Sequence, residues 1–306
     1  MASAELVGLT ALTIEYVVGI ALNLYILLVY IGNLNNGLSM GPSDKILFTK
    51  ALVHVSLHVS MNGQNIIGFF WPHLFFKQEF LLSIIMIFMS LIIYSFWLTA
   101  LLCVYYFSNI TTWSHRVLAL LKRSLLSYLL HVLLVSALGS VAISCPVFWF
   151  CFVESSGNST HQISVMRWTF IHNVAYRIMS AILGLFLPLL IALVSTMLTS
   201  WSLINHMRRM YQNNWGFTRS KFQTQINATR TMVLFLLILV ISSVVQIFFF
   251  SIPSSVPDYI ALILWFIVIS YPVPEAIIII QSSVKFRRTL LSRLFDKKRG
   301  NKEDET

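Results

Sequence analysis

Seven long apolar runs determine what this chain can fold into. A helix needs about 20 predominantly apolar residues to cross the hydrocarbon core of a bilayer, and it pairs its backbone groups internally, as hydrocarbon requires. Each run is long enough for one crossing. We therefore predict an all-α membrane protein in which residues 1–281 form one seven-transmembrane helix bundle. The predicted helices cover residues 6–31, 46–70, 80–108, 124–150, 173–205, 229–252 and 258–281.

The composition argues against a soluble protein. Of the 306 residues, 57% are hydrophobic and 10% are charged, whereas soluble proteins carry roughly 25% charged residues. A soluble fold of this length could not bury so many apolar side chains, so we also exclude a nucleic-acid-binding domain. The three cysteines form no Cys-x-x-Cys pair, and we expect no metal site, no cofactor and no structural disulfide. The first run is too long for a signal peptide and is expected to remain as the first helix.

The basic residues predict the orientation of the bundle. With alternate loops inside, 18 lysines and arginines, including Lys45 and Lys50, lie on the inner side, against three on the outer side. The positive-inside rule then places the N-terminus outside and the C-terminus in the cytoplasm, as in a multi-pass protein of the plasma membrane. Attraction to anionic lipid or to a cytoplasmic partner is a further interpretation of the net charge of +10. Asn158 begins an Asn-Ser-Thr sequon in the longest outer loop, where we expect glycosylation.

Residues 282–306 form a predicted cytoplasmic tail. Within residues 285–299 the basic residues surround one apolar helical face, and this pattern is typical of a short amphipathic helix on the inner membrane surface. The face consists of Phe286, Leu290, Leu291, Leu294 and Phe295.

Five short motifs occur in order along the chain. Glu15, Gly19 and Asn23 stand four residues apart in the first predicted helix. The other motifs are Trp97-Leu98 with Ser114-His115, Pro188 with Ser202-Leu203 and His206, Arg230-Thr231 with Phe235-Leu236, and Tyr271-Pro272 with Ile278. Together they resemble the bitter taste receptors of the type 2 taste receptor family, and the resemblance covers nearly the whole chain. The DRY and NPxxY motifs of rhodopsin-like receptors do not occur.

Several polar positions depart from the pattern of that family. The family's Arg in the second helix falls on His54, and its His in the seventh helix falls on Glu275. Its Lys in the third helix, its His before the sixth and its Asn in the seventh fall on Asn109, Gln225 and Ser283. These departures indicate a divergent, non-mammalian member.

The resemblance implies a G-protein-coupled receptor. Such a receptor would bind small bitter-type compounds between the outer halves of helices 2, 3, 5, 6 and 7, and would activate a gustducin-like heterotrimeric G protein. A vomeronasal type 1-like pheromone receptor and a seven-helix small-solute transporter are the alternatives, since architecture alone does not decide function. No HExxH motif surrounds His54 and His58, and no Gly-rich phosphate loop occurs, so we expect no enzyme. The expected partners are bitter agonists, the G protein and membrane lipid, with no nucleic acid.

The ligand site is expected to be a mostly apolar cavity with a few polar groups. Ordinary packing or lipid contact is the alternative role for each apolar candidate. Arg177 lies 11 residues before Pro188, and its side chain would face either the ligand or a lipid headgroup. The candidates are Gln64, Asn65, Phe69, Phe88, Met89, Ile92, Arg177, Ser180, Ala181, Gln246, Phe249 and Trp265.

Two further sets of residues complete the predicted sites. Ionisable residues inside a membrane span are costly and usually face the bundle interior, so we expect Glu15, Asn23, His54 and Glu275 to meet at mid-depth. A neutral packing cluster without a switching role is the alternative. The resemblance assigns the G-protein contact to Ser114, His115, Arg116, His206, Met210, Gln225 and Arg230.

Overall fold

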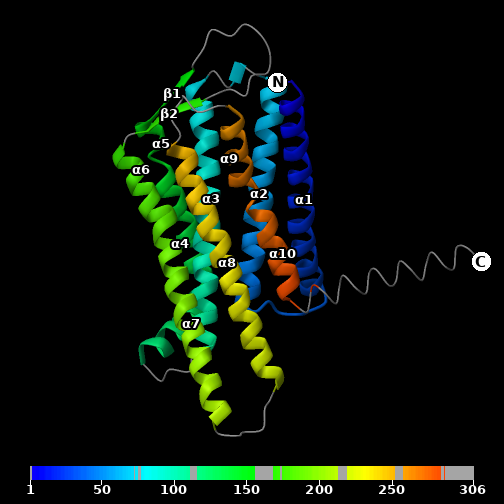
Figure 1. The fold of residues 1–306 in the computed structure, drawn as a ribbon, viewed down its shortest axis with the longest axis vertical. Coiled ribbons are helices and arrows are strands. Elements are labelled where there is room, and N and C mark those ends of the chain that lie inside the picture. Colours follow the sequence, from blue (N-terminus) through cyan, green and yellow to red (C-terminus); the bar gives the residue numbers. More distant parts are fainter. Residues whose placement is uncertain are drawn as a thin grey trace, which may run out of the picture.

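The structure is a computed structural model that describes residues 2–71, 73–74, 77–110, 116–155, 168–172, 174–212, 219–251, 258–283 and 286. It is a bundle of long helices (Figure 1). The first four are α1 (Ala2–Asn35), α2 (Pro42–Phe70), α3 (Gln78–Ile110) and α4 (Arg116–Ser144). A short helix, α5 (Val147–Phe150), and an antiparallel hairpin of β1 (Cys151–Ser155) and β2 (Trp168–His172) follow, with Cys151 opposite His172. The sequence analysis did not predict this hairpin.

The second half of the chain contains two interrupted helices. The first of them consists of α6 (Val174–Ala181), a π-helix η2 (Ile182–Phe186) and α7 (Leu187–Gln212), which follow one another directly. Next comes α8 (Arg219–Ser251), and the last segment consists of α9 (Asp258–Ser270) and α10 (Pro272–Ser282). Pro272 and Pro274 lack the backbone N–H that a continuous helix would use, which explains the break at Tyr271.

Local sequence sets the turn between α1 and α2. Gly37 has a φ of 77°, and the N–H groups of Gly37 and Leu38 bond back to the carbonyls of Leu34 and Asn33. This left-handed residue closes the C-terminus of α1 at little steric cost because glycine has no Cβ. Pro42 then begins α2, where a proline needs no N–H partner, and Asp44 in the first turn favours the positive end of the helix dipole.

Six helical segments in the described part of the chain are long and apolar enough to cross a membrane. They are Thr10–Asn35, Gln78–Ile110, Ser127–Phe150, Val174–Arg208, Gln223–Phe249 and Ile263–Ser282. α2 has 29 residues but is not among them, because Lys50, His54 and His58 lower its apolar character. All three side chains are buried in the bundle. The all-α membrane bundle predicted from the sequence is therefore confirmed in its coarse form.

α3 lies at the centre of the bundle and packs against α2, α4, α7 and α8. Its inward residues Ile92, Phe96 and Leu98 are fully buried. Large apolar side chains such as Leu138 and Trp201 are exposed on the outside of the bundle, as expected where lipid replaces water. α1 begins at the end of the bundle that carries the hairpin, and α10 runs toward the opposite end (Figure 1).

The start of the tail differs from the prediction of an apolar face on the membrane surface. Phe286 is buried against α1 instead. The Tyr25 hydroxyl donates a hydrogen bond of 2.9 Å to the Phe286 carbonyl, and the Phe286 ring meets the Tyr30 ring edge-on at 5.2 Å between centroids. The contacts of the Phe286 ring with Tyr25 and Tyr30 stabilise this position beyond the area that they bury. The rest of the predicted helix 285–299 lies outside the described residues.

Candidate functional site

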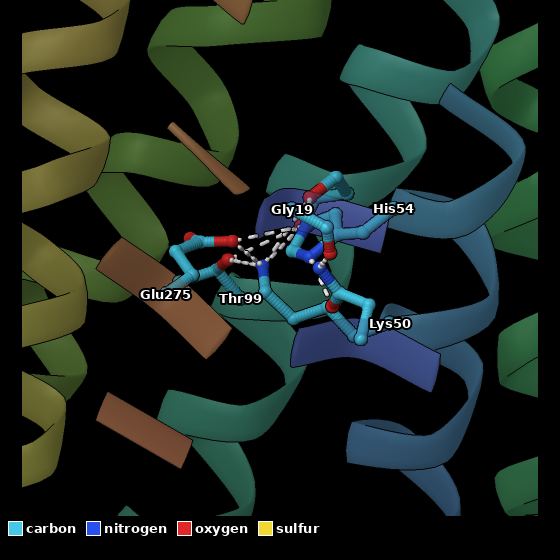
Figure 2. A network of polar contacts seen from close by, with 7 residues as sticks. Gly19, Lys50, His54, Thr99 and Glu275 are labelled. Atoms are coloured by element: carbon cyan, nitrogen blue, oxygen red, sulfur yellow. Dashed lines mark hydrogen bonds and ion pairs between the residues drawn. The ribbon is translucent and has the colours of Figure 1, made fainter. Parts of the chain in front are cut away.

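A buried lysine lies at the centre of the polar residues inside the bundle. Lys50 is fully buried on α2, and its Nζ lies 2.9 Å from Oε2 of Glu275 on α10 (Figure 2). Lys50 also donates to the Ser95 carbonyl at 3.1 Å and to the Thr99 hydroxyl, both on α3. The prediction that Lys50 is an inner-loop charge was therefore wrong. Lys50 lies near the start of an apolar run, and no local pattern shows that it pairs with Glu275, which lies far away in the sequence.

His54, one turn further along α2, links four helices. Its Nε2 lies 3.1 Å from Oε2 of Glu275 and 2.9 Å from the Ser95 hydroxyl, and its Nδ1 lies 3.3 Å from Oδ1 of Asn23 on α1. The Asn23 amide nitrogen donates to the Gly19 carbonyl at 2.9 Å. Its oxygen therefore faces Nδ1 of His54 and is available as a hydrogen-bond acceptor.

The arrangement of charges explains how this site is tolerated in an apolar bundle. Taking a lysine and a carboxylate out of water costs several kcal/mol for each ion, and only close pairing with additional hydrogen bonds offsets that cost. Lys50 has Glu275 and two acceptors on α3, and its Nζ lies 5.6 Å from the centre of the Phe235 ring on α8. We call Asn23, Lys50, His54, Ser95, Thr99 and Glu275 the central polar network.

Glu15 does not join this network. It lies about two helical turns before Asn23 on α1 and faces His58 on α2, with 4.0 Å between its Oε2 and Nδ1 of His58. The Tyr16 ring meets the His58 ring edge-on at 6.2 Å. The structure thus brings Asn23, His54 and Glu275 together as expected, but it places Glu15 in a second pair nearer the start of α1.

Gly19 makes room for that second pair. A Cβ at this position would lie 2.3 Å from Nε2 of His58, far inside van der Waals contact. The four-residue spacing of Glu15, Gly19 and Asn23 therefore has a physical meaning. It puts a small residue on the face of α1 that packs against the imidazole of α2.

Three of the predicted ligand residues are aromatic and contact one another through tilted rings. The Trp265 ring on α9 lies 5.4 Å from the Phe88 ring on α3 and 5.3 Å from the Phe249 ring on α8, between centroids. Gln246, one turn before Phe249, is buried, and its amide nitrogen has no hydrogen-bond partner among the described residues. We call Phe88, Phe249 and Trp265 the aromatic trio.

The other ligand candidates differ in how deeply they are buried. Ile92 is buried beside Phe88, and Arg177 is exposed on α6. Asn65 and Phe69 belong to α2, but their side chains lie outside the described part. Gln64, Met89, Ser180 and Ala181 are half-buried.

At the opposite end of the bundle, two of the predicted G-protein residues share a small cavity. His206 on α7 and Gln225 on α8 line about 20 Å³ together with Ile110, Ser202 and Leu203. Arg230 is exposed on α8. Arg116 and Met210 belong to α4 and α7, with side chains outside the described part, and Ser114, His115 and Asn158 lie wholly outside it.

Comparison with known proteins identifies the family. The family model described as taste receptor protein (TAS2R) matches residues 1–298. The chain belongs to this family. Relatives include taste receptor type 2 member 40 of Gallus gallus, 26% identical over 262 residues that cover 82% of each chain. Taste receptor type 2 member 2 of Homo sapiens is 23% identical over 289 residues, which cover 93% of this chain and 94% of the human protein.

The motifs predicted membership of the taste receptor family, and the family match confirms it. The central polar network is the largest group of polar contacts described in this member. In this taste receptor the network joins His54 of α2 to Glu275 of α10, with 3.1 Å between Nε2 and Oε2. Lys50, one turn from His54 on the same helix, places its amino group 2.9 Å from Oε2 of Glu275. Both α2 side chains thus contact the same carboxylate of α10.

Proposed function

We propose that this chain is a bitter taste receptor of the plasma membrane. It crosses the membrane seven times, with α2 as the span that is not apolar enough to be recognised by composition, and with its N-terminus outside. It binds small, largely apolar compounds between α2, α3, α6, α8 and α9 and activates a gustducin-like heterotrimeric G protein at the opposite end. The family match over residues 1–298 carries this proposal.

The aromatic trio supports the position of the ligand site. Trp265 contacts rings from two other helices, so a flat apolar ligand that inserts here contacts α3, α8 and α9 at once. Gln246, three residues before Phe249, offers an amide nitrogen that has no hydrogen-bond partner in the described part of the chain. A mostly apolar site with few polar groups is what small-molecule recognition requires.

The chain itself connects the trio with the central polar network. Six residues after Trp265, the Tyr271 ring at the break between α9 and α10 meets the His54 ring at 5.8 Å and the Phe96 ring at 5.6 Å. Glu275 lies in the first turn of α10. We propose that an agonist favours a bundle in which α9 has moved, and that the network transmits this shift toward His206 and Gln225 by a change of populations.

The proposal is tested by a panel of bitter compounds applied to cells that express the chain together with a gustducin-like G protein. Calcium release in response to a panel member, absent from untransfected cells, is the expected result. Trp265→Ala should raise the effective agonist concentration about tenfold or more, as loss of an aromatic anchor typically does. Trp201→Ala, which alters a Trp exposed on the outside of α7, is the matched control and should respond like the original chain.

Other outcomes distinguish the alternatives. Uptake of a labelled solute without calcium release would show a transporter. A response to volatile signalling compounds, with none to the bitter panel, would favour a pheromone receptor. Equal responses of the Trp265 and Trp201 variants at equal surface expression would refute the position of the ligand site.

A further inference from the structure

Glu15 on α1 and His58 on α2 form a buried acid–base pair that lies apart from the central polar network. Their exposed fractions are 8% and 1%. Oε2 of Glu15 lies 4.0 Å from Nδ1 of His58, so the two groups are neighbours without being hydrogen-bonded, since such bonds rarely exceed about 3.2 Å. Neither the proposed ligand site nor the proposed G-protein contact includes this pair.

The pair has little around it that could stabilise a charge. Within the described part of the chain, both carboxylate oxygens of Glu15 and Nε2 of His58 lack a hydrogen-bond partner. Nε2 faces the backbone of α1, since a Cβ on Gly19 would lie 2.3 Å from it. Glu275 differs, because two nitrogen atoms lie within 3.1 Å of its Oε2. A net charge on the pair is therefore far less well compensated than the charges of the central polar network.

The ionisable neighbours of the pair do not supply a compensating charge. His54, one turn before His58 on α2, contacts Glu275 and Asn23 instead, and a positive charge on it would repel a second proton on His58. On α1, the Tyr16 ring meets the His58 ring edge-on at 6.2 Å. The helices α3, α4, α9 and α10 pack against α1 or α2, and their described acidic or basic side chains are Glu79 and His131, both exposed, and Glu275.

The number of protons on the pair sets its net charge. With one proton the pair is neutral overall, whether the proton lies on the carboxyl group or on the imidazole. Loss of this proton leaves a carboxylate beside a neutral imidazole, and gain of a second proton leaves an imidazolium beside a neutral carboxylic acid. Either change buries an uncompensated charge, which apolar surroundings strongly disfavour. The folded bundle therefore favours the pair with one proton.

We propose that Glu15 and His58 hold a single proton between them and make the contact between α1 and α2 sensitive to acidity. Either change of protonation places a net charge where the two helices are in close contact at Gly19, so it should weaken their packing. Glu15 lies in the half of α1 nearer the hairpin end of the bundle (Figure 1). The proposed topology places this end outside the cell, and on that proposal the pair responds to extracellular acid.

The thermal unfolding midpoint of the purified full-length chain in detergent, measured from about pH 3 to about pH 9, tests the proposal. The reference is the double variant Glu15→Gln, His58→Gln, and subtracting its profile cancels the other ionisable groups. We expect the difference to be largest between about pH 4.3 and 6.5, the ordinary pKa values at which Glu and His in the unfolded chain titrate. Outside this window it should fall by several degrees, since one proton changes the unfolding constant up to about tenfold per pH unit.

The single variants separate the two sides of the profile. Glu15→Gln should lose stability only on the acid side, as His58 gains a proton, and His58→Gln only on the alkaline side, as Glu15 loses one. His131→Gln, which alters an exposed histidine on α4, is the control and should keep the original profile. An original chain whose profile runs parallel to that of the double variant would overturn the proposal, and so would alkaline loss that persists in Glu15→Gln. The measurement needs no agonist, so its failure is distinguishable from failure of the proposed receptor function.

Discussion

The Glu275 carboxylate has two nitrogen partners inside the bundle, and they are not equivalent. Lys50 pairs with Glu275 and donates hydrogen bonds to α3, whereas His54 spreads its contacts over α1, α3 and α10. The ion pair therefore balances the charge, and the imidazole holds the helices in register. The sequence alone predicted His54 and Glu275 from their place within apolar runs. It could not predict Lys50, because nothing in a local pattern shows that a lysine near the start of a run turns inward.

Lys50→Met should destabilise the receptor by about 3–5 kcal/mol, because it leaves Glu275 buried without its charge partner. The double variant Lys50→Met, Glu275→Leu should recover much of this loss, since it removes both charges. The measurement is the thermal unfolding midpoint of the purified chain in detergent. Lys45→Met, on the same helix but without an ion pair in the described structure, is the control and should change little. Equal loss in the single and double variants would show that the charges do not compensate each other.

Gly19→Ala should destabilise the contact between α1 and α2 by about 1–3 kcal/mol, the usual cost of overpacking a filled site. The new Cβ would collide with the His58 imidazole, and so His58→Ser in the same chain should restore stability. Gly63→Ala is a matched control on α2, because a Cβ there meets nothing within 4 Å. Thermal unfolding of the three variants measures the effect. A Gly19→Ala chain as stable as Gly63→Ala would contradict the tight contact.

At the scale of elements, the apolar runs did not predict two features: the polar ends of the helices and the interruptions within them. Hydropathy identifies the part of a helix that contacts hydrocarbon, so it misses polar ends. α4 accordingly begins at Arg116 rather than at residue 124, and α8 at Arg219 rather than at residue 229. The π-helix η2 is invisible in an apolar run because a change of hydrogen-bond register alters no side chain. Residues 258–281 were likewise predicted as one helix, although Pro272 and Pro274 cannot continue the backbone ladder, and the structure breaks there between α9 and α10.

Phe286→Ala should release the start of the tail from α1. The ring is fully buried against Tyr25 and Tyr30, and removing a buried Phe typically costs about 3–5 kcal/mol. The expected result is a lower unfolding midpoint together with faster hydrogen exchange in the last turn of α10. Phe248→Ala, which truncates a ring exposed on the outside of α8, should have a much smaller effect. Identical behaviour of the two variants would argue against docking of the tail.

At the scale of the whole molecule, the proposed receptor architecture requires an odd number of membrane crossings. Composition identifies six spans within the described residues, and an even number would leave both termini on one side. α2 is the proposed seventh span, and its charges are tolerable in hydrocarbon only because Glu275 and α3 surround them. Lys50 and His54 make α2 less apolar than the other spans, and the same two residues pair it with Glu275 of α10 inside the bundle.

Epitope tags at both termini test this central claim most directly. The measurement is antibody staining of cells expressing the full chain, before and after permeabilisation. With seven crossings, the N-terminal tag stains on intact cells and the C-terminal tag stains only after the membrane is opened. Tags that stain together, either both on intact cells or both only after permeabilisation, would contradict the seventh crossing and with it the receptor architecture proposed for this chain.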